Sequence, residues 1–420
     1  MLDFLTEPLQ YEFIQRALIA SISIGVSCGL IGVYIMLRRM SLIGDALAHS
    51  VLPGVVIGFM IAGEKNEIAL FIGALAAGIV SALLISFVQR NSKIKEDTSI
   101  GIIFTGAFAL GILLVSQLKQ VHLDLSSYLF GDVLGVSTGD IILSGIITVI
   151  ILLSVILFYK QLLVTSFDPT MAKIIGISSA VVHYFLMTLL SMSIVTGLQS
   201  VGVILIIAML ITPPATAFLL TDKLKWLLFY SALIGVVSSI AGLYLSYYFN
   251  YTSGASIVLV AVLIFALAFF FSPKEGLVLK YLKRMKAQRM NTLEDVVKFI
   301  HRYGERYRDE EFKTMLAKEI GVSGNKLGGI MNELSNKGFV TKTNGHYYLT
   351  TEGHKLALRL VRSHRLWETY VTKENIVDAK DIHIDAEKFE HILPEDLVEE
   401  LDRELGHPET DPHGSPIPKK

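Results

Sequence analysis

The sequence predicts an all-α polytopic membrane protein with about nine transmembrane helices, followed by a soluble C-terminal region that contains a winged helix. Three observations lead to this fold class. Apolar runs fill residues 11–271, and a helix needs roughly 20 apolar residues to cross a bilayer. Residues 274–420 hold 25 of the 37 Lys and Arg and 25 of the 38 Asp and Glu, so the first part is too apolar for a soluble domain. The C-terminal third shows short amphipathic helices and a hairpin pattern.

These changes predict four segments. They are a transmembrane domain at 1–273, a basic linker at 274–290, a winged helix at 291–353, and a metal-binding and dimerisation domain at 354–420. The expected spans lie near 11–37, 45–62, 67–89, 98–118, 139–159, 177–197, 199–219, 225–247 and 254–271. The sixth and seventh almost touch, which leaves eight spans as the alternative. The stretch 121–135 is too short to span and is expected to be interfacial or re-entrant.

Basic residues indicate the orientation of the chain in the membrane. They cluster after the odd-numbered spans, as with Arg38 and Arg39 after the first and the run 280–289 after the ninth. Because cytoplasmic loops carry the excess of Lys and Arg, nine spans place the N-terminus outside and the C-terminal region in the cytoplasm. The expected location is therefore the plasma membrane, with the apolar spans facing membrane lipid.

Two ionisable residues stand out within the second span. Asp45 and His49 in GDALAHS are four residues apart and share one helix face. Intramembrane ionisable groups are rare and usually mark a substrate path, and Asp with His is a ligand pair for a divalent metal. The structural alternatives are that Asp45 begins the span and that His49 is a packing histidine. His183 is expected near the middle of the sixth span. Its role is either that of a metal ligand or one in packing or gating.

The chain contains no phosphate-binding loop of the GxxxxGK[ST] type. It also has few of the buried ionisable residues that a proton-driven carrier needs. A transporter without an energy source of its own implies a partner ATPase, so we expect a transport subunit rather than an enzyme.

The C-terminal region has its own sequence of elements. A helix at VVKFIHRYGERY precedes a helix-turn-helix at 312–338 and two β-type runs around Asn344-Gly345, which together predict a winged helix. The loop 160–176 contains Asp168-Pro169, which begins a short helix that Gly176 can end. That helix is either a plain surface helix or a docking element for a cytoplasmic partner.

Potential metal ligands gather after the winged helix. His364 and Glu368 are four residues apart, and IHIDAEKFEH supplies His383, Glu387, Glu390 and His391. Oxygen and nitrogen donors without sulfur suit Mn²⁺ or Fe²⁺, although Zn²⁺ would bind too. The structural alternative is a solvated charged helix.

The membrane part resembles the permease subunits of the ABC-3 family of manganese, zinc and iron importers. The resemblance covers residues 10–272 and is carried by MLRRMSLIGDALAHSVLPGVVIGF, FDPTMAKIIGIS and LQSVGVILIIAMLITPPATA. It implies that Asp168, Ala172 and Gly176 belong to the coupling helix that docks on the ATPase, and that Asp45 and His49 lie on the ion path. It further implies two copies forming the pore and an extracellular metal-binding lipoprotein.

The C-terminal part, about residues 291–418, resembles the diphtheria-toxin-repressor family of metal-dependent regulators. The order of the winged helix, RSHRLWE, HIDAEKFEH and GHPETDPHGSPIP carries this resemblance. It implies one metal site of His364, Glu368 and His383. It implies another of Asp295, Glu387, Glu390 and His391, similar to the manganese-responsive branch. Lys298 departs from that branch, which has an acidic residue there, and puts a two-metal centre in doubt.

The resulting hypothesis is the permease subunit of an ATP-driven importer of Mn²⁺, or alternatively of Fe²⁺ or Zn²⁺. Its C-terminal region would sense cytoplasmic metal, dimerise and adjust transport, with the sign of the adjustment open. The rival is a membrane-tethered, metal-dependent DNA-binding regulator. DNA binding is the less favoured role, because residues 291–360 hold 11 basic and 9 acidic residues rather than a basic face. A third interpretation gives the region dimerisation alone.

Overall fold

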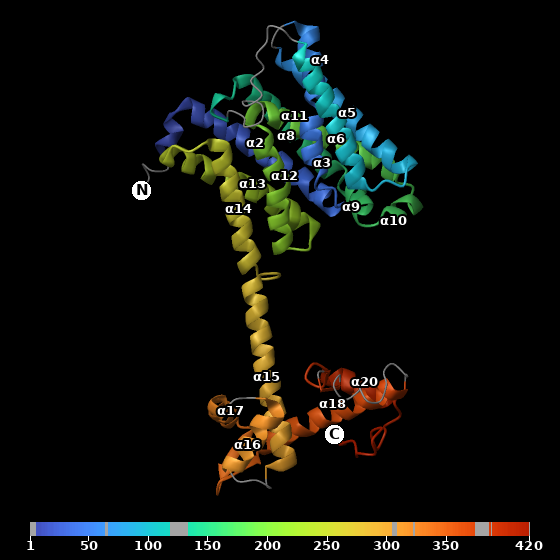
Figure 1. The fold of residues 1–420 in the computed structure, drawn as a ribbon, viewed down its shortest axis with the longest axis vertical. Helices are drawn as coiled ribbons and strands as arrows, with labels where there is room; N and C mark the ends of the chain where they lie inside the picture. Colours follow the sequence, from blue (N-terminus) through green and yellow to red (C-terminus); the bar gives the residue numbers. More distant parts are fainter. Residues whose placement is uncertain are drawn as a thin grey trace. The chain divides into compact units, whose positions relative to one another are not determined.

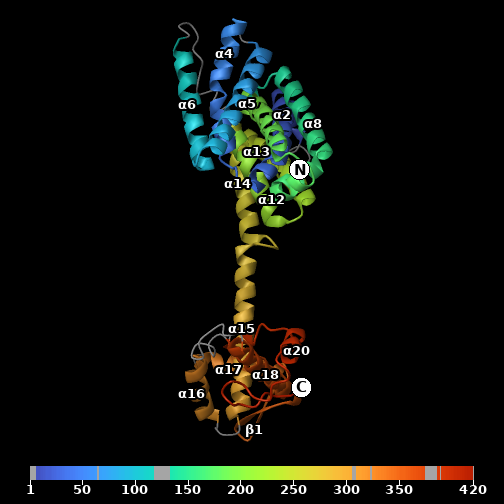
Figure 2. The same cartoon turned by 90° about the vertical axis from the view of Figure 1, so that its right-hand side faces the viewer.

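The computed structural model describes residues 6–63, 66–117, 133–304, 309–321, 324–373, 386–387 and 389–419. Contacts divide the chain into two compact units, Met1–Lys280 and Tyr281–Lys420, here called the membrane domain and the tail. Figure 1 labels helices of both units, and Figure 2 labels strand β1 (Val340–Thr343).

Nine helices among the described residues are long and apolar enough to cross a membrane. They are α2 (Glu12–Leu37), α3 with α4 (Ile43–Ser50 and Leu52–Ala62), α5 (Glu67–Asn91), α6 (Glu96–Ser116), α8 (Thr138–Leu157), α11 (Ser179–Val201), α12 (Val203–Leu220), α13 (Leu224–Phe249) and α14 (Ser253–Phe271). The prediction of nine spans is confirmed. The sixth and seventh are separate helices that meet at Gly202, four residues later than expected.

Four short elements lie before or between these helices: η1 (Pro8–Gln10), η2 (Val133–Gly135), α9 (Tyr159–Phe167) and α10 (Pro169–Ile174). Most of the stretch 121–135 lies outside the described residues, and only η2 belongs to the described part. Its expected interfacial position stays a prediction.

Helix α2 forms the centre of the membrane domain. It packs against α13, α12, α8 and α11, and its Ala17, Cys28 and Tyr34 are fully buried. The outer helices α6, α8 and α14 instead expose large apolar side chains such as Leu113, Ile156 and Leu259. Such apolar side chains are stable in contact with lipid, because they need no hydrogen-bond partner.

The second span is broken into α3 and α4 at Val51. Pro53 lies at the beginning of α4 and lacks the backbone N–H that would otherwise bond to the carbonyl of His49. Helix α4 then packs closely on α5, beside α6 (Figure 2). At their crossing, a Cβ on Gly54 would lie 2.1 Å from the carbonyl oxygen of Gly73, so glycine is required for this approach.

The tail begins within a long helix, α15 (Leu277–Tyr303). Residues from Leu277 onward in the expected basic linker are therefore helical. The elements α16 (Asp309–Ile320), α17 (Gly324–Asn336), β1 (Val340–Thr343) and β2 (His346–Leu349) follow. The strands pair antiparallel from Val340↔Leu349 to Thr343↔His346, around Asn344 and Gly345 with φ of +53° and +82°. Positive φ at both positions is the two-residue hairpin turn that this dipeptide favours.

Apolar side chains join these elements into one core. Val297 and Ile300 of α15, Phe312 of α16, Leu327 of α17 and Tyr347 of β2 are all buried in it. The winged helix is thus built as predicted. Helices α18 (Thr351–Lys373) and α20 (Glu395–Glu404) form a smaller cluster through Leu366 and Val398, and Ile417 near the C-terminus completes it.

Candidate metal centres

Asp45 and His49 lie one turn apart on α3. The Nε2 atom of His49 is 3.5 Å from Oδ1 of Asp45, and the two side chains are 21% and 48% exposed, respectively. The imidazole also packs against two rings of α6, Phe104 and Phe108, with centroid separations of 5.5 and 5.4 Å. One carboxylate and one imidazole that remain partly accessible can contact a divalent ion, while the aromatic rings fix the orientation of the imidazole.

His183 has different surroundings. Helix α11 begins at Ser179, so His183 lies in its second turn rather than near the middle of the span as expected. Its Nε2 is 3.1 Å from Oγ of Ser86 on α5. His183 also lines a cavity of about 760 Å³ with Arg38, Arg39 and Lys173. These neighbours are cations and hydroxyls rather than metal ligands, which favours a role in packing or gating.

The predicted short helix after the fifth span exists as α10. Asp168 caps it, because its Oδ1 accepts hydrogen bonds from the backbone N–H groups of Thr170 and Met171, both at 2.9 Å. Ala172 is fully buried, and Gly176 follows the helix with φ of +80°. The three residues predicted from the sequence thus belong to one short helix. Asp168 caps its N-terminus, Ala172 packs on its buried face, and Gly176 follows its C-terminal end.

Arg38 connects the end of α2 to the helix that precedes α10. Its guanidinium donates hydrogen bonds to Oγ1 of Thr165 at 2.9 Å and to Oγ of Ser166 at 3.3 Å, both on α9. The sequence marked Arg38 only as an orientation signal. Its bonds to residues 127 and 128 positions away depend on tertiary packing, which no local pattern reveals.

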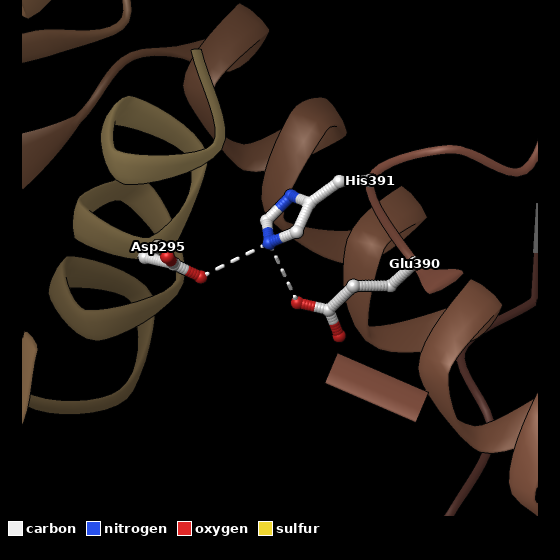
Figure 3. A group of neighbouring side chains, drawn as sticks. All are labelled: Asp295, Glu390 and His391. Carbon is white, nitrogen blue, oxygen red and sulfur yellow. Dashed lines mark ion pairs between the residues drawn. The ribbon is translucent and has the colours of Figure 1, made fainter. Parts of the chain in front are cut away.

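The tail gathers three of its predicted ligands at one point (Figure 3). Asp295 comes from α15, while Glu390 and His391 follow each other in the segment before α20. Nε2 of His391 is 3.2 Å from Oδ1 of Asp295 and 3.5 Å from Oε1 of Glu390. One ligand atom from each residue lies within 4.8 Å of the others.

This geometry fits a divalent transition metal. Such ions bind oxygen and nitrogen at about 2.0–2.2 Å, so two ligands at right angles lie roughly 3 Å apart. The separations of 3.2 and 3.5 Å around His391 are of this size, and the donors are two carboxylates and one imidazole. That donor set suits Mn²⁺, Fe²⁺ or Zn²⁺.

Glu390 joins the second predicted group to the first. Its side chain is 0% exposed, and its Oε2 lies 2.7 Å from Nδ1 of His364. Nε2 of His364 is in turn 3.1 Å from Oε1 of Glu368. Lys298 donates to Oε1 of Glu390 at 2.5 Å. The two sites implied by resemblance are therefore contiguous, and the Lys298 ammonium bonds to Glu390, the carboxylate that joins them.

Glu294 belongs to the same cluster, although the sequence analysis missed it. Its Oε2 lies 2.7 Å from Nδ1 of His391, and its Oε1 lies 3.7 Å from Arg359. Burial alone would lower the pKa of His391, but hydrogen bonds with Asp295 and Glu294 raise it to about 9. A usable signal was present, since Glu294 falls among the apolar positions of α15 beside Leu293 and Val297.

The remaining predicted ligands are placed differently. Glu387 is exposed at the surface of the tail. His383 lies outside the described residues, so its assignment to a site with His364 and Glu368 stays a prediction. The name tail cluster is used below for the contiguous charged side chains among the described residues, which are Glu294, Asp295, Lys298, His364, Glu368, Glu390 and His391.

Comparisons with known proteins match the membrane domain and the tail to two different families. Residues 10–272 match the model of the ABC 3 transport family. Residues 350–419 match the model of the iron dependent repressor, metal binding and dimerisation domain. The first match covers most of the membrane domain, and the second covers the part of the tail that holds His364, Glu368, Glu390 and His391.

Individual relatives agree with the first match. The chain is 49% identical over 288 residues to the manganese transport system membrane protein MntC of Halalkalibacterium halodurans, covering 69% of this chain and 97% of the relative. It is 43% identical over 286 residues to a probable iron transport system membrane protein of Haemophilus influenzae, covering 68% of this chain and 99% of the relative. The solved structure of PsaBC from Streptococcus pneumoniae in complex with Fab aligns with a TM-score of 0.60 and 43% identity, over 68% of this chain and all of that one.

Proposed function

Because the chain belongs to the ABC 3 transport family, we propose that it is the permease subunit of an ATP-driven importer of a divalent transition metal, with Mn²⁺ as the favoured substrate. The observation that carries the proposal is the Asp45–His49 pair on α3, inside an otherwise apolar span. The manganese transport relative supports the choice of metal, and the iron transport relative makes Fe²⁺ the alternative to test, with Zn²⁺.

In this proposal two copies of the chain form the pore. Partner ATPases hydrolyse ATP in the cytoplasm, and an extracellular metal-binding lipoprotein delivers the ion. The N-terminus faces outside, and the tail lies in the cytoplasm, as the distribution of Lys and Arg requires. Helix α10 docks on the ATPase, and Arg38 carries movement from α9 to the end of α2 through its bonds to Thr165 and Ser166.

The ion contacts the carboxylate of Asp45 and Nε2 of His49 as it passes. Two protein ligands leave the other coordination positions to water, so the ion is held weakly enough to leave again. The rings of Phe104 and Phe108 keep the imidazole in place during this exchange. Selectivity comes from donor type and geometry rather than from affinity alone.

The test is uptake of Mn²⁺ into liposomes that contain the chain with its ATPase and binding protein. Asp45→Ala is expected to abolish ATP-dependent uptake. Asp222→Ala removes an exposed acid between α12 and α13 and should leave uptake near the wild-type rate. Wild-type uptake by Asp45→Ala would remove this residue from the ion path. Direct uptake of Fe²⁺ and Zn²⁺, measured in the same liposomes, identifies which ions are substrates.

The tail cluster serves as a sensor of metal that has entered the cell. Asp295, Glu390 and His391 hold the ion, which supplies positive charge among buried carboxylates and joins α15 to the segment before α20. Ion binding slows import if it favours the inhibited state of the transporter over the active one. The match of residues 350–419 to a metal-binding and dimerisation domain supports this role and a dimer of tails.

Loading the liposomes with internal Mn²⁺ tests the sensor. Internal Mn²⁺ should slow uptake by the wild type, and His391→Ala or deletion of residues 285–420 should relieve the inhibition. His407→Ala, which changes a histidine outside the tail cluster, is the matched control. If internal Mn²⁺ slows the wild type, His391→Ala and the deletion variant equally, the tail does not regulate transport. Faster uptake with internal metal would reverse the sign.

The winged helix makes DNA binding the second candidate function. The described basic side chains near α17 are partly neutralised, since Glu333 pairs with Arg289 at 2.5 Å and with Lys337 at 3.4 Å. This disfavours a phosphate-binding face. A gel shift of the promoter of its own gene by the purified full chain with Mn²⁺ would establish the rival. Absence of a shift with intact metal uptake supports the transport role.

A further inference from the structure

The tail cluster contains a cation of its own at the atom that a metal ion would use. Oε1 of Glu390 is the oxygen that lies 3.5 Å from His391 and completes the group with Asp295. The same oxygen accepts a hydrogen bond from the ammonium of Lys298 at 2.5 Å. Lys298 reaches it because it lies one turn after Asp295 on α15, on the same helix face.

A metal ion and this ammonium cannot share the oxygen at low energetic cost. An ion about 2.2 Å from Oε1 would lie at most about 4.7 Å from the Lys298 nitrogen, because the two distances to Oε1 set the limit. Glu390 is 0% exposed, so water does little to screen two positive charges at this separation. Metal binding therefore requires the ammonium to leave.

The surroundings allow that departure without dismantling the site. Lys298 keeps 23% of its side chain exposed, so its flexible stem can carry the ammonium to solvent. Glu390 stays in place, because its other oxygen is held by Nδ1 of His364 at 2.7 Å. His391 is held independently by Glu294 at 2.7 Å.

We propose that Lys298 is a tethered competitor, which occupies the metal-binding oxygen of Glu390 when metal is scarce and must be displaced by the incoming ion. It neutralises the buried carboxylate of Glu390 in the metal-free tail and raises the metal concentration at which the tail responds. Such a tail stays metal-free at the low metal concentrations at which import is needed. It binds the ion only at higher concentrations. This inference rests on the proposed sensor role of the tail.

The competitor sets a measurable threshold. Breaking one hydrogen bond between charged groups changes an equilibrium by roughly 10- to 100-fold. A neutral residue at position 298 removes that competition, so the dissociation constant for Mn²⁺ should fall by about the same factor. A longer cation that still reaches Glu390 should preserve the threshold.

The experiment is a titration of the purified full chain with Mn²⁺, in which electron paramagnetic resonance reports the free ion. All variants carry Asp45→Asn, so that the span does not contribute. Lys298→Leu and Lys298→Gln are expected to bind Mn²⁺ about 10- to 100-fold more tightly than the parent. Lys298→Arg should bind as the parent does. Lys286→Leu, an exposed position on α15, is the matched control and should bind as the parent does.

Two neutral variants keep the test decisive if one of them fails to fold. If the folded neutral variants bind Mn²⁺ no more tightly than the parent, the proposal that Lys298 competes with the ion is wrong. It is also wrong if the tail binds no Mn²⁺ at all. Transport distinguishes this failure from that of the sensor. If Lys298→Leu, with Asp45 intact, tightens binding and is inhibited at correspondingly lower internal Mn²⁺, competitor and sensor are both supported. Tighter binding with unaltered inhibition supports the competitor and contradicts the sensor.

Discussion

Replacing Gly54 by alanine is expected to force α4 away from α5 and to destabilise the membrane domain. The added Cβ would lie 2.1 Å from the carbonyl oxygen of Gly73 and 2.6 Å from Cβ of Ala77. Ordinary contact begins at 3.4 Å, so the closest pair is short by about 1.3 Å. The obstructing atom belongs to helix backbone and cannot rotate away, so the helices themselves must separate.

Forcing an extra carbon into a packed contact costs about 1–3 kcal/mol. Alanine returns up to about 1 kcal/mol through its higher helix propensity. Because the clash is with backbone, the upper part of the packing range, about 2–3 kcal/mol, applies, and we expect a net loss of about 1–2 kcal/mol in the free energy of unfolding. Uptake of Mn²⁺ should fall as well, because α4 is the continuation of α3 and its displacement moves Asp45 and His49.

The assay is thermal unfolding of the purified full chain in detergent, together with uptake in liposomes. Gly106→Ala on α6 is the matched control, because a Cβ there has no atom within 4 Å. The control should unfold at the wild-type temperature or slightly above it, and Gly54→Ala clearly below. Equal unfolding temperatures for the two alanine variants would refute the idea that the Gly54–Gly73 crossing holds the second span.

Three further predictions concern other contacts. In the metal-free chain the pKa of His391 is raised from 6.5 to about 9, so its stabilising charge is fully present below pH 6.5 and is lost as pH rises through 9. Hydrogen exchange of α15 and α18, corrected for its intrinsic pH dependence, should therefore accelerate between pH 7 and 9.5, and His391→Gln should remove this effect. Asp168→Ala should cost α10 about 1 kcal/mol and reduce metal-stimulated ATP hydrolysis, whereas Asp168→Asn keeps the cap and most of the activity. Arg38→Gln should lower uptake severalfold, and the exposed Arg39→Gln should not, since only Arg38 bonds to Thr165 and Ser166 among the described contacts of α9.

The sequence predicted the spans and the winged helix because their signals are local. Long apolar runs suffice for a membrane helix, and Asn344-Gly345 between two β-type runs suffices for the hairpin turn. The cap of α10 at Asp168 is equally local, since the side chain bonds to backbone two and three residues later. In each case the determining atoms lie within a few residues of one another.

The arrangement of the tail cluster was less accessible for the opposite reason. Helical spacing placed His364 one turn from Glu368, but it could not place His364 against Glu390, which is 26 residues away. Nor could it bring Lys298 to Glu390 across 92 residues. Charge at position 298 was visible as a departure from a family pattern, but its contact with a metal-binding oxygen depends on how α15 packs against the later segment.

The break at Val51 has a mechanical consequence for the membrane domain. It leaves Asp45 and His49 on an eight-residue helix that contacts α5, α6, α11 and α12 as well as α4. The backbone keeps helical φ and ψ at Val51, but the hydrogen bond that Pro53 cannot make leaves the joint between α3 and α4 weaker than the rest of the span. Because four neighbouring helices besides α4 contact α3, a shift of any one of them would move the carboxylate of Asp45 and the imidazole of His49 together.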